Sequence, residues 1–195
     1  MIHCIQKITL LLCTSLLAFQ SMADWQLTPD NSTVNFTSVK KEHLIENHYF
    51  NRVSANITEQ GEATLTIDLS SVNTKIAIRD QRIKEHLFNI ATFPQATFSA
   101  QIDMQKIATL LVGSTGEMQI SGQVDLHGHK QNLVVKVLVT KVSKDIVLVA
   151  SQESLIIKAQ DFDLVAGINK LKSLANLPSI SYSVPVNFVL TFTHQ

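Results

Sequence analysis

The sequence has only two cysteines, Cys4 and Cys13, and both lie within the first 23 residues. Residues 24–195 contain no thiol at all. This part of the chain can therefore form no disulfide, no cysteine-based metal site and no catalytic thiolate. Its stability has to come from a hydrophobic core.

Glycine and net charge are also scarce. The chain has 6 glycines, and none of them forms a glycine-rich phosphate loop or a G-x-S-x-G nucleophile motif. Its 16 basic and 16 acidic residues balance, so nothing attracts a phosphate backbone, and we expect no nucleic-acid partner. Because 45% of the residues are hydrophobic and only 16% are charged, we expect a large buried apolar surface.

The first 23 residues are typical of a secretory signal peptide. Lys7 precedes a leucine-rich run over residues 8–19, and Ser21-Met22-Ala23 forms a small-x-small cleavage site. The run is shorter than the roughly 20 apolar residues that span a bilayer. We expect cleavage after Ala23, which leaves residues 24–195 as a single exported domain.

Apolar and polar residues alternate with period two through most of residues 24–195, which predicts β-strands. The clearest runs are 53–57, 63–69, 96–102, 118–126, 133–139, 146–150 and 180–192. The runs 53–57 and 63–69 flank a turn and predict a hairpin, and residues 71–78 are expected to continue as a strand. About eight antiparallel strands with one apolar face close into a barrel or pack as a sandwich.

One stretch breaks this alternation. Ile83, Leu87 and Ile90 follow helical spacing and predict a short helix that the Arg79-Asp80 pair opens. On a barrel, such a helix would cover one end. A second short helix or loop is expected over 168–175.

Several positions on the expected inner face are small, namely Ala96, Ala100, Gly122 and Ala150. Small residues there would leave a cavity inside the barrel. The alternative is a filled core in which large side chains pack against small ones, as in a structural or interaction domain.

Asp125, His127 and His129 form the best candidate metal site, because alternate residues of a strand point to one face. A metal-dependent enzyme that uses these three residues is one alternative function. However, Gly128 lies between the histidines, where a hairpin turn is expected, and this favours a solvated turn over a metal site. His43 and His48 lie in a stretch expected to be a polar loop.

Arg79 and Asp80 have two interpretations. An aspartate in the first turn of a helix interacts favourably with the helix dipole, and the arginine would then form a salt bridge. Alternatively, an arginine at the rim of an apolar cavity would bind the polar head of a lipid. Arg79 is therefore our candidate head-group residue.

Four motifs together resemble the YceI-like family of lipid- or polyisoprenoid-binding periplasmic proteins. They are S-S-V-N-T-K-I-A-I-R-D (70–80), F-P-Q-A-T-F-S (93–99), S-T-V-N-F (32–36) and I-S-G-Q-V-D-L-H-G (120–128). Trp25 near the expected mature start also fits. The resemblance covers nearly all of residues 24–195.

The resemblance implies a lipocalin-like antiparallel β-barrel of about eight strands with one or two short helices. It also implies binding, storage or transport of a polyisoprenoid or quinone-type lipid in the periplasm, without enzymatic activity and with no cofactor besides the lipid. Homodimers occur in the family, and a transient contact with a membrane is a further expectation. From the alternation and the family pattern, we predict that the apolar pocket is lined by Phe36, Leu65, Ile67, Leu87, Phe93, Phe98, Val124, Val135, Phe188 and Leu190.

Overall fold

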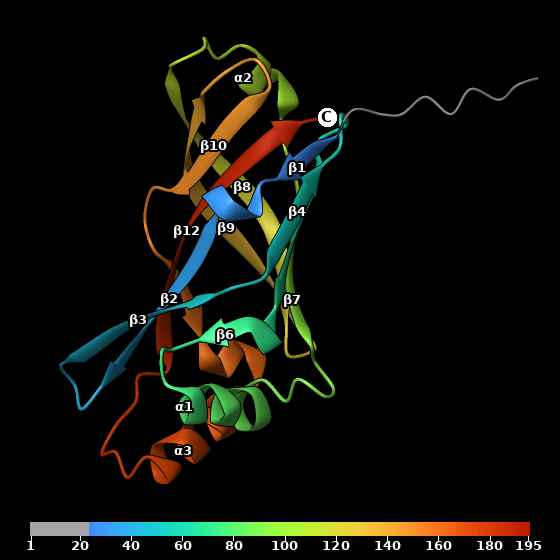
Figure 1. The fold of residues 1–195 in the computed structure, drawn as a ribbon. Coiled ribbons are helices and arrows are strands. Elements are labelled where there is room, and N and C mark those ends of the chain that lie inside the picture. The colour runs from blue at the N-terminus through green and yellow to red at the C-terminus, as the bar shows by residue number, and fades with distance from the viewer. Residues whose placement is uncertain (1–23) are drawn as a thin grey trace, which may run out of the picture.

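The computed structural model describes residues 24–195 (Figure 1). The predicted signal peptide lies outside the described residues. No helix within residues 24–195 is long and apolar enough to cross a membrane.

The described chain is mainly β-structure. The strands are β1 (Trp25–Leu27), β2 (Thr33–Lys40), β3 (Leu44–Phe50), β4 (Val53–Ile57), β5 (Glu62–Asp68), β6 (Val72–Asn73), β7 (Gln95–Gln101), β8 (Thr115–Leu126), β9 (His129–Lys141), β10 (Ile146–Ser151), β11 (Leu155–Lys158) and β12 (Ser183–His194). The helices are α1 (Ala77–Arg82), α2 (Met104–Ala108) and α3 (Val165–Leu174), with a π-helical turn η3 (Ile83–Leu87) and 3-10 turns η1 (Pro29–Asn31), η2 (Leu69–Ser71) and η4 (Ala159–Phe162).

Eight of these strands close into an antiparallel barrel in the order β1-β4-β5-β7-β8-β9-β10-β12. The short strand β1 completes the ring, because Trp25 pairs with His194 of β12 and with Ile57 of β4. The predicted hairpin is β4–β5, in which Ala55 faces Leu65. The predicted fold class, a lipocalin-like antiparallel barrel with a few short helices, is confirmed.

Strands β2 and β3 form a long hairpin that extends past the barrel. β2 pairs with β12 from Thr33 to Phe36, and β3 pairs with β2 from Leu44 to Tyr49. The hairpin projects beside the end of the barrel that α1 and α3 cover (Figure 1). The expectation of a polar loop around His43 and His48 is wrong for His48, which lies within β3 and is 3% exposed.

The helical segment that follows β5 begins earlier than predicted. Residues 71–78 do not form one strand, because β6 ends at Asn73 and Lys75 has a left-handed backbone with φ of 63°. Helix α1 begins at Ala77 and continues directly into η3. The second expected helix is present as α3, which packs against η3 (Figure 1). Helix α2 at the opposite end of the barrel was not predicted.

Two clusters of buried apolar residues form the core. One lies along the inner face of the barrel strands and includes Val137, Val139 and Phe192. The other joins the barrel to the helical end and includes Phe162 and Ile168. α3 approaches η3 very closely, since a Cβ atom on Gly167 would lie 2.7 Å from the carbonyl oxygen of His86. The helices therefore form a packed cover over this end of the barrel.

Candidate functional site

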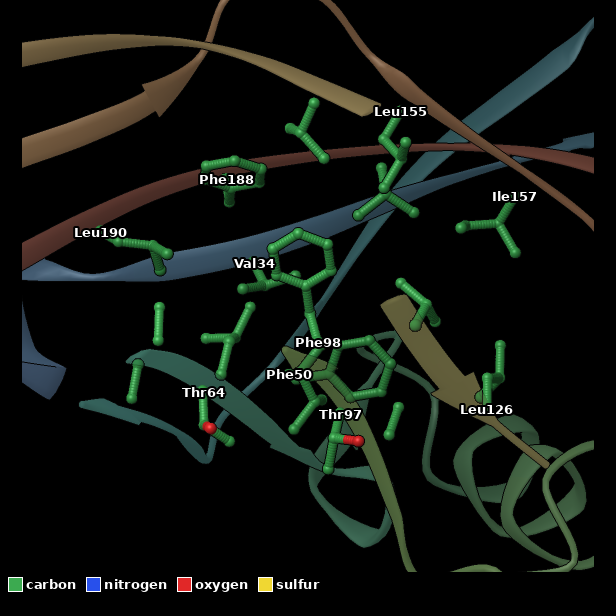
Figure 2. Close-up of a pocket in the computed structure, with 18 of the residues that line it drawn as sticks. Val34, Phe50, Thr64, Thr97, Phe98, Leu126, Leu155, Ile157, Phe188 and Leu190 are labelled. Carbon is green, nitrogen blue, oxygen red and sulfur yellow. The ribbon is translucent and has the colours of Figure 1, made fainter. Parts of the chain in front are cut away.

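An apolar cavity of about 260 Å³ lies inside the barrel. Its lining comes from the barrel strands, from β2, β3 and β11, and from helical segments at both ends. Asn56, Thr64 and Thr97 are its only polar lining residues within 24–195. Figure 2 shows apolar side chains directed into this space from several strands. The interior is therefore hollow and offers a ligand almost exclusively hydrophobic contacts.

The cavity extends along the barrel strands. On β12, every second residue from Val184 to Phe192 lines it, and the intervening side chains point away. At about 3.3 Å of rise per residue, these eight steps span roughly 26 Å. A single acyl chain reaches about half the roughly 30 Å hydrocarbon core of a bilayer, so the cavity has room for a longer chain.

Strand alternation positions the lining, and one glycine shapes it. Phe98 of β7 lies over Gly122 of β8, where a Cβ atom would be 2.4 Å from the Phe98 ring. The strands pair directly here, with Ala100 opposite Gly122. Ala96 lies two residues before Phe98, on the same face, and its small side chain also borders the cavity. The Phe98 ring thus fits only because Gly122 has no side chain. The small side chain of Ala96 leaves part of the barrel interior unfilled.

All of the predicted pocket residues except Phe93 line the cavity. They are Phe36, Leu65, Ile67, Leu87, Phe98, Val124, Val135, Phe188 and Leu190. The structure therefore brings them together from six strands and η3. Their contact with a ligand stays a prediction.

Phe93 is the exception, because it lies outside the cavity lining. Its amide donates to the carbonyl oxygen of Asn89, which places it in the turn before β7. Its ring packs against His127, with 4.5 Å between the ring centroids. Phe93 thus covers the β8–β9 turn on the outside, and the prediction that Phe93 lines the pocket is wrong.

The sequence reasoning missed the contribution of α3. Leu164 and Ile168 line the cavity and are 6% and 5% exposed. Leu164, Ile168 and Leu171 follow the i, i+4, i+7 spacing of a helical stripe, which would have indicated a buried face. The helical cover is therefore made by two segments, η3 and α3, instead of the single expected helix.

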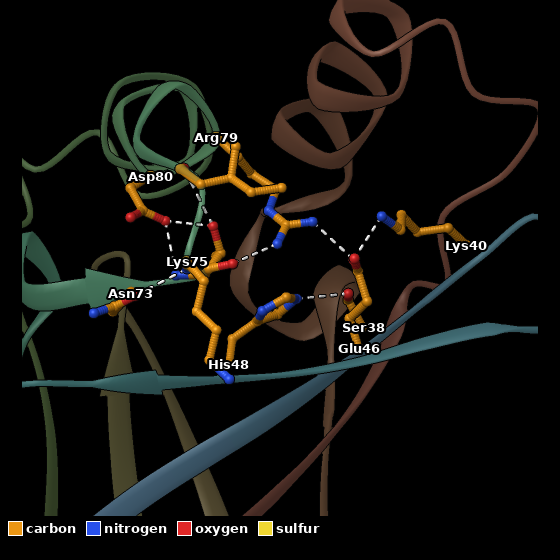
Figure 3. Close-up of polar contacts among 10 residues, drawn as sticks. Ser38, Lys40, Glu46, His48, Asn73, Lys75, Arg79 and Asp80 are labelled. Carbon is orange, nitrogen blue, oxygen red and sulfur yellow. Dashed lines mark hydrogen bonds and ion pairs between the residues drawn. The ribbon is translucent and has the colours of Figure 1, made fainter.

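A network of polar side chains lies between the β2–β3 hairpin and α1 (Figure 3). Arg79 donates from Nη1 to Glu46 Oε2 at 2.7 Å and from Nη2 to the carbonyl oxygen of Thr74 at 2.6 Å. Lys40 also pairs with Glu46. The hydrogen bond from Lys40, aided by the charge of Arg79, lowers the pKa of Glu46 although burial opposes the shift. Glu46 is therefore an ionised anchor for both cations.

Arg79 and Asp80 do not pair with each other. Asp80 Oδ1 accepts hydrogen bonds from the amide and the hydroxyl of Thr74, which fixes the segment leading into α1. Arg79 thus forms a salt bridge, as the first interpretation expects, and its partner is Glu46. A contact with a ligand head group stays a prediction.

His48 is the buried member of this network. Its Nε2 lies 2.9 Å from Ser38 Oγ, and its ring packs on Phe36 with 5.0 Å between centroids. Burial, reinforced by the positive charge of Arg79, lowers the pKa of His48 to about 4. The imidazole is therefore neutral at neutral pH.

The expected metal site lies at the tight turn between β8 and β9. His127 and Gly128 both have positive φ, and His129 is exposed. No group of three His, Cys, Asp or Glu side chains within residues 24–195 is arranged to hold a metal ion. The structure thus gives the metal-enzyme alternative based on Asp125, His127 and His129 no site.

Comparison with known proteins places this barrel in a family. A polyisoprenoid-binding domain from Saccharophagus degradans, implicated in plant cell wall breakdown, is 40% identical, covers 88% of this chain and 98% of its own, and superposes with a TM-score of 0.86. Burkholderia cenocepacia BcnA is 21% identical, with coverages of 85% and 98% and a TM-score of 0.66. The Campylobacter jejuni YCEI protein is 17% identical, with coverages of 76% and 84% and a TM-score of 0.53. These last two likenesses concern the fold alone.

No curated protein matches the chain. The model of the YceI-like domain, however, matches residues 25–192, which is nearly the whole of the described structure. The motifs, the closed barrel and this match agree, and the chain belongs to the YceI-like family.

Proposed function

We propose that this protein binds a long isoprenoid lipid in the barrel cavity and stores or carries it in the periplasm. The observation that carries the proposal is the long cavity, which is lined by apolar side chains from one end of the barrel to the other. The 40% identical relative, described as a polyisoprenoid-binding domain, supports the choice of ligand class. The signal-like residues before Asp24 support export.

Hydrophobic burial is sufficient to hold such a ligand. Each buried methylene contributes about 0.8 kcal/mol, so a five-carbon isoprene unit contributes about 4 kcal/mol before the ordering cost. A few units in contact with the lining therefore give tight binding without polar contacts. A chain that is this apolar is insoluble in water, so a carrier would exchange it through transient contact with a membrane. A homodimer is a further expectation from the family.

The test is native mass spectrometry of the purified protein, followed by organic extraction of any bound lipid. We expect a bound mass that corresponds to a long apolar lipid. Repeated absence of lipid, together with failure of the protein to bind an added long-chain isoprenoid, would refute the proposal.

Two neighbouring substitutions on β8 provide a matched control. Ile120 lines the cavity, and Ser121 points to solvent from the same strand. Ile120→Asp places a carboxylate in the cavity, where an unpaired charge is costly, and we expect loss of the lipid. Ser121→Asp adds the same charge outside, and it should leave the lipid in place in a protein of unchanged circular dichroism.

A further inference from the structure

Four large apolar side chains are exposed on two neighbouring segments at the helical end of the molecule. Leu44 and Ile45 lie at the start of β3, next to the tip of the β2–β3 hairpin. Ile76 and Ile78 lie where the chain enters α1. All four are at least 42% exposed. Single exposed apolar residues are common on protein surfaces, but a group of them on adjoining segments marks an interaction site.

Polar contacts join these segments into one surface. Arg79 of α1 pairs with Glu46 of β3 at 2.7 Å, so the start of α1 lies against the hairpin. On the other side of the hairpin, the backbone amide of Lys41 donates to the carbonyl oxygen of Ser179, which follows α3. The hairpin tip, α1 and α3 therefore lie at the same end of the molecule (Figure 1).

This surface is basic, although the rest of the described chain is acidic. We call it the hairpin–helix face and define it by residues 40–46, 75–87 and 165–180. It carries eight basic and four acidic side chains, whereas the other residues of 24–195 carry seven basic and twelve acidic ones. Its lysines that form no ion pair within residues 24–195 are Lys41, Lys75, Lys84, Lys170 and Lys172. The balanced net charge of the whole chain conceals this distribution.

Exposed apolar and basic side chains on one surface suit an anionic bilayer. Each lysine near negative head groups contributes about fivefold to the affinity, and the apolar side chains enter the boundary between head groups and acyl chains. A second copy of this chain, bound through the same face, would bring like charges together. A nucleic acid would contact the lysines but leave the isoleucines exposed to water.

We propose that the hairpin–helix face docks on the surface of an anionic phospholipid bilayer, with the apolar side chains of the hairpin tip and of the start of α1 between the head groups. Docking in this way turns the cover formed by η3 and α3, which lines the cavity on its inner side, toward the bilayer. The role of this face in lipid exchange rests on the proposed function. The docking itself needs no ligand in the cavity.

A second group of exposed apolar side chains lies at the opposite end of the barrel and provides the control. Leu111 and Val112 are highly exposed in the loop between α2 and β8, and the amide of Gly113 in this loop donates to the carbonyl oxygen of Lys141. Residues 103–113 and 141–145 carry three basic and two acidic side chains. This end therefore has exposed apolar residues without a comparable excess of positive charge.

The first test locates the docking face with a fluorophore. It uses vesicles of equal parts phosphatidylglycerol and phosphatidylcholine, with vesicles of phosphatidylcholine alone as the neutral reference. Because Cys4 and Cys13 both lie in the predicted signal peptide, Ile45→Cys or Leu111→Cys gives the exported protein a single thiol for an environment-sensitive label. We expect a blue shift of the label at position 45 with the anionic vesicles only, and no shift at position 111.

The second test measures binding of delipidated variants to the anionic vesicles by co-sedimentation. Lys75→Glu removes one favourable charge and adds an unfavourable one, so it should weaken binding by about 25-fold. Ile45→Ser removes an inserted apolar side chain and should weaken binding by about tenfold. The matched controls at the other end, Lys144→Glu and Leu111→Ser, should bind like the wild type. All four positions are exposed, and circular dichroism checks that each variant keeps the fold.

Three outcomes would overturn the proposal: equal binding of the wild type to neutral and anionic vesicles, a label that shifts at position 111 but not at position 45, and no association with anionic vesicles at all. None of these would affect lipid binding in the cavity, which the extraction experiment tests separately. Conversely, binding to vesicles that depends on Ile45 and Lys75, in a protein that takes up no isoprenoid, would support the docking face and refute the proposed function.

Discussion

The sign of one stability change distinguishes a hollow barrel from a filled one. Ala96 lines the cavity and is 9% exposed, and Ala96→Ile would add three carbon atoms to its side chain. In a filled core, this added volume would cost about 1–3 kcal/mol through overpacking. In the hollow barrel, the new atoms enter the cavity and bury apolar surface, which contributes about 0.8 kcal/mol for each carbon and about 2 kcal/mol in total. The cavity of about 260 Å³ has room for them, since an apolar cavity of roughly 150 Å³ already accepts benzene.

The assay is urea unfolding of delipidated wild type and Ala96→Ile, because a bound lipid would itself stabilise the folded state. Ser99→Ile is the control, since Ser99 lies on the outer face of the same strand β7 and reports the strand propensity of isoleucine alone. We expect Ala96→Ile to raise the free energy of unfolding above that of the control and to weaken binding of a long isoprenoid. A loss of 1 kcal/mol or more relative to the control would show that the barrel interior is packed, and the reasoning from the cavity would fail.

Two further predictions concern the helical end. Gly167→Val should lower the free energy of unfolding by about 1–3 kcal/mol, since a Cβ atom there would lie 2.7 Å from the His86 carbonyl oxygen and 2.9 Å from Leu87 Cα; chemical denaturation measures it, and an unchanged midpoint would contradict the close packing. The second prediction is a pH dependence that originates at His48. Its folded-state pKa of about 4 lies below the usual 6.5, so as pH falls the unfolded chain takes up a proton first and stability is lost between pH 6.5 and pH 4. Between pH 7 and pH 5 the loss should be about 2 kcal/mol, and His48→Phe should flatten it. An equal slope in wild type and variant would show that His48 is not the source.

The barrel strands were predictable because one face of each is apolar and the other polar. Along β12, valine, phenylalanine and leucine recur at every second position, so the alternation identifies both the strand and its inner face. The same phase places Phe98 correctly in the cavity. Phe93 precedes Pro94 and lies in the turn before β7, where strand alternation no longer determines the direction of a side chain.

Only the start of the β2–β3 hairpin could be predicted from the sequence, because the alternation does not continue past Phe36. Its inner face carries His48 opposite Phe36, Glu46 opposite Ser38, and then Lys40, while Ile45 is 68% exposed. Polar residues on the inner face and an apolar residue on the outer face reverse the usual pattern, so a prediction from hydrophobicity assigns this segment to a loop. The burial of His48 follows from the packing of α1 over this face, which is a tertiary contact that no local pattern contains.

The two ends of the cavity differ in the polarity of the residues around them. At the α2 end, the lining residues Ile102, Ile107 and Phe192 are apolar and at most 8% exposed, so an oxygen atom there would have no partner. At the helical end, the Phe36 ring lines the cavity and packs on His48, and the charged pair of Lys40 and Glu46 lies farther along the same hairpin. An uncharged polar group that is buried without a hydrogen bond costs about 1–3 kcal/mol, so a lipid with one polar end would lose roughly that much if it entered reversed. The barrel alone selects for an apolar chain, and the polar continuation of one hairpin would determine which end of that chain points toward α1 and α3.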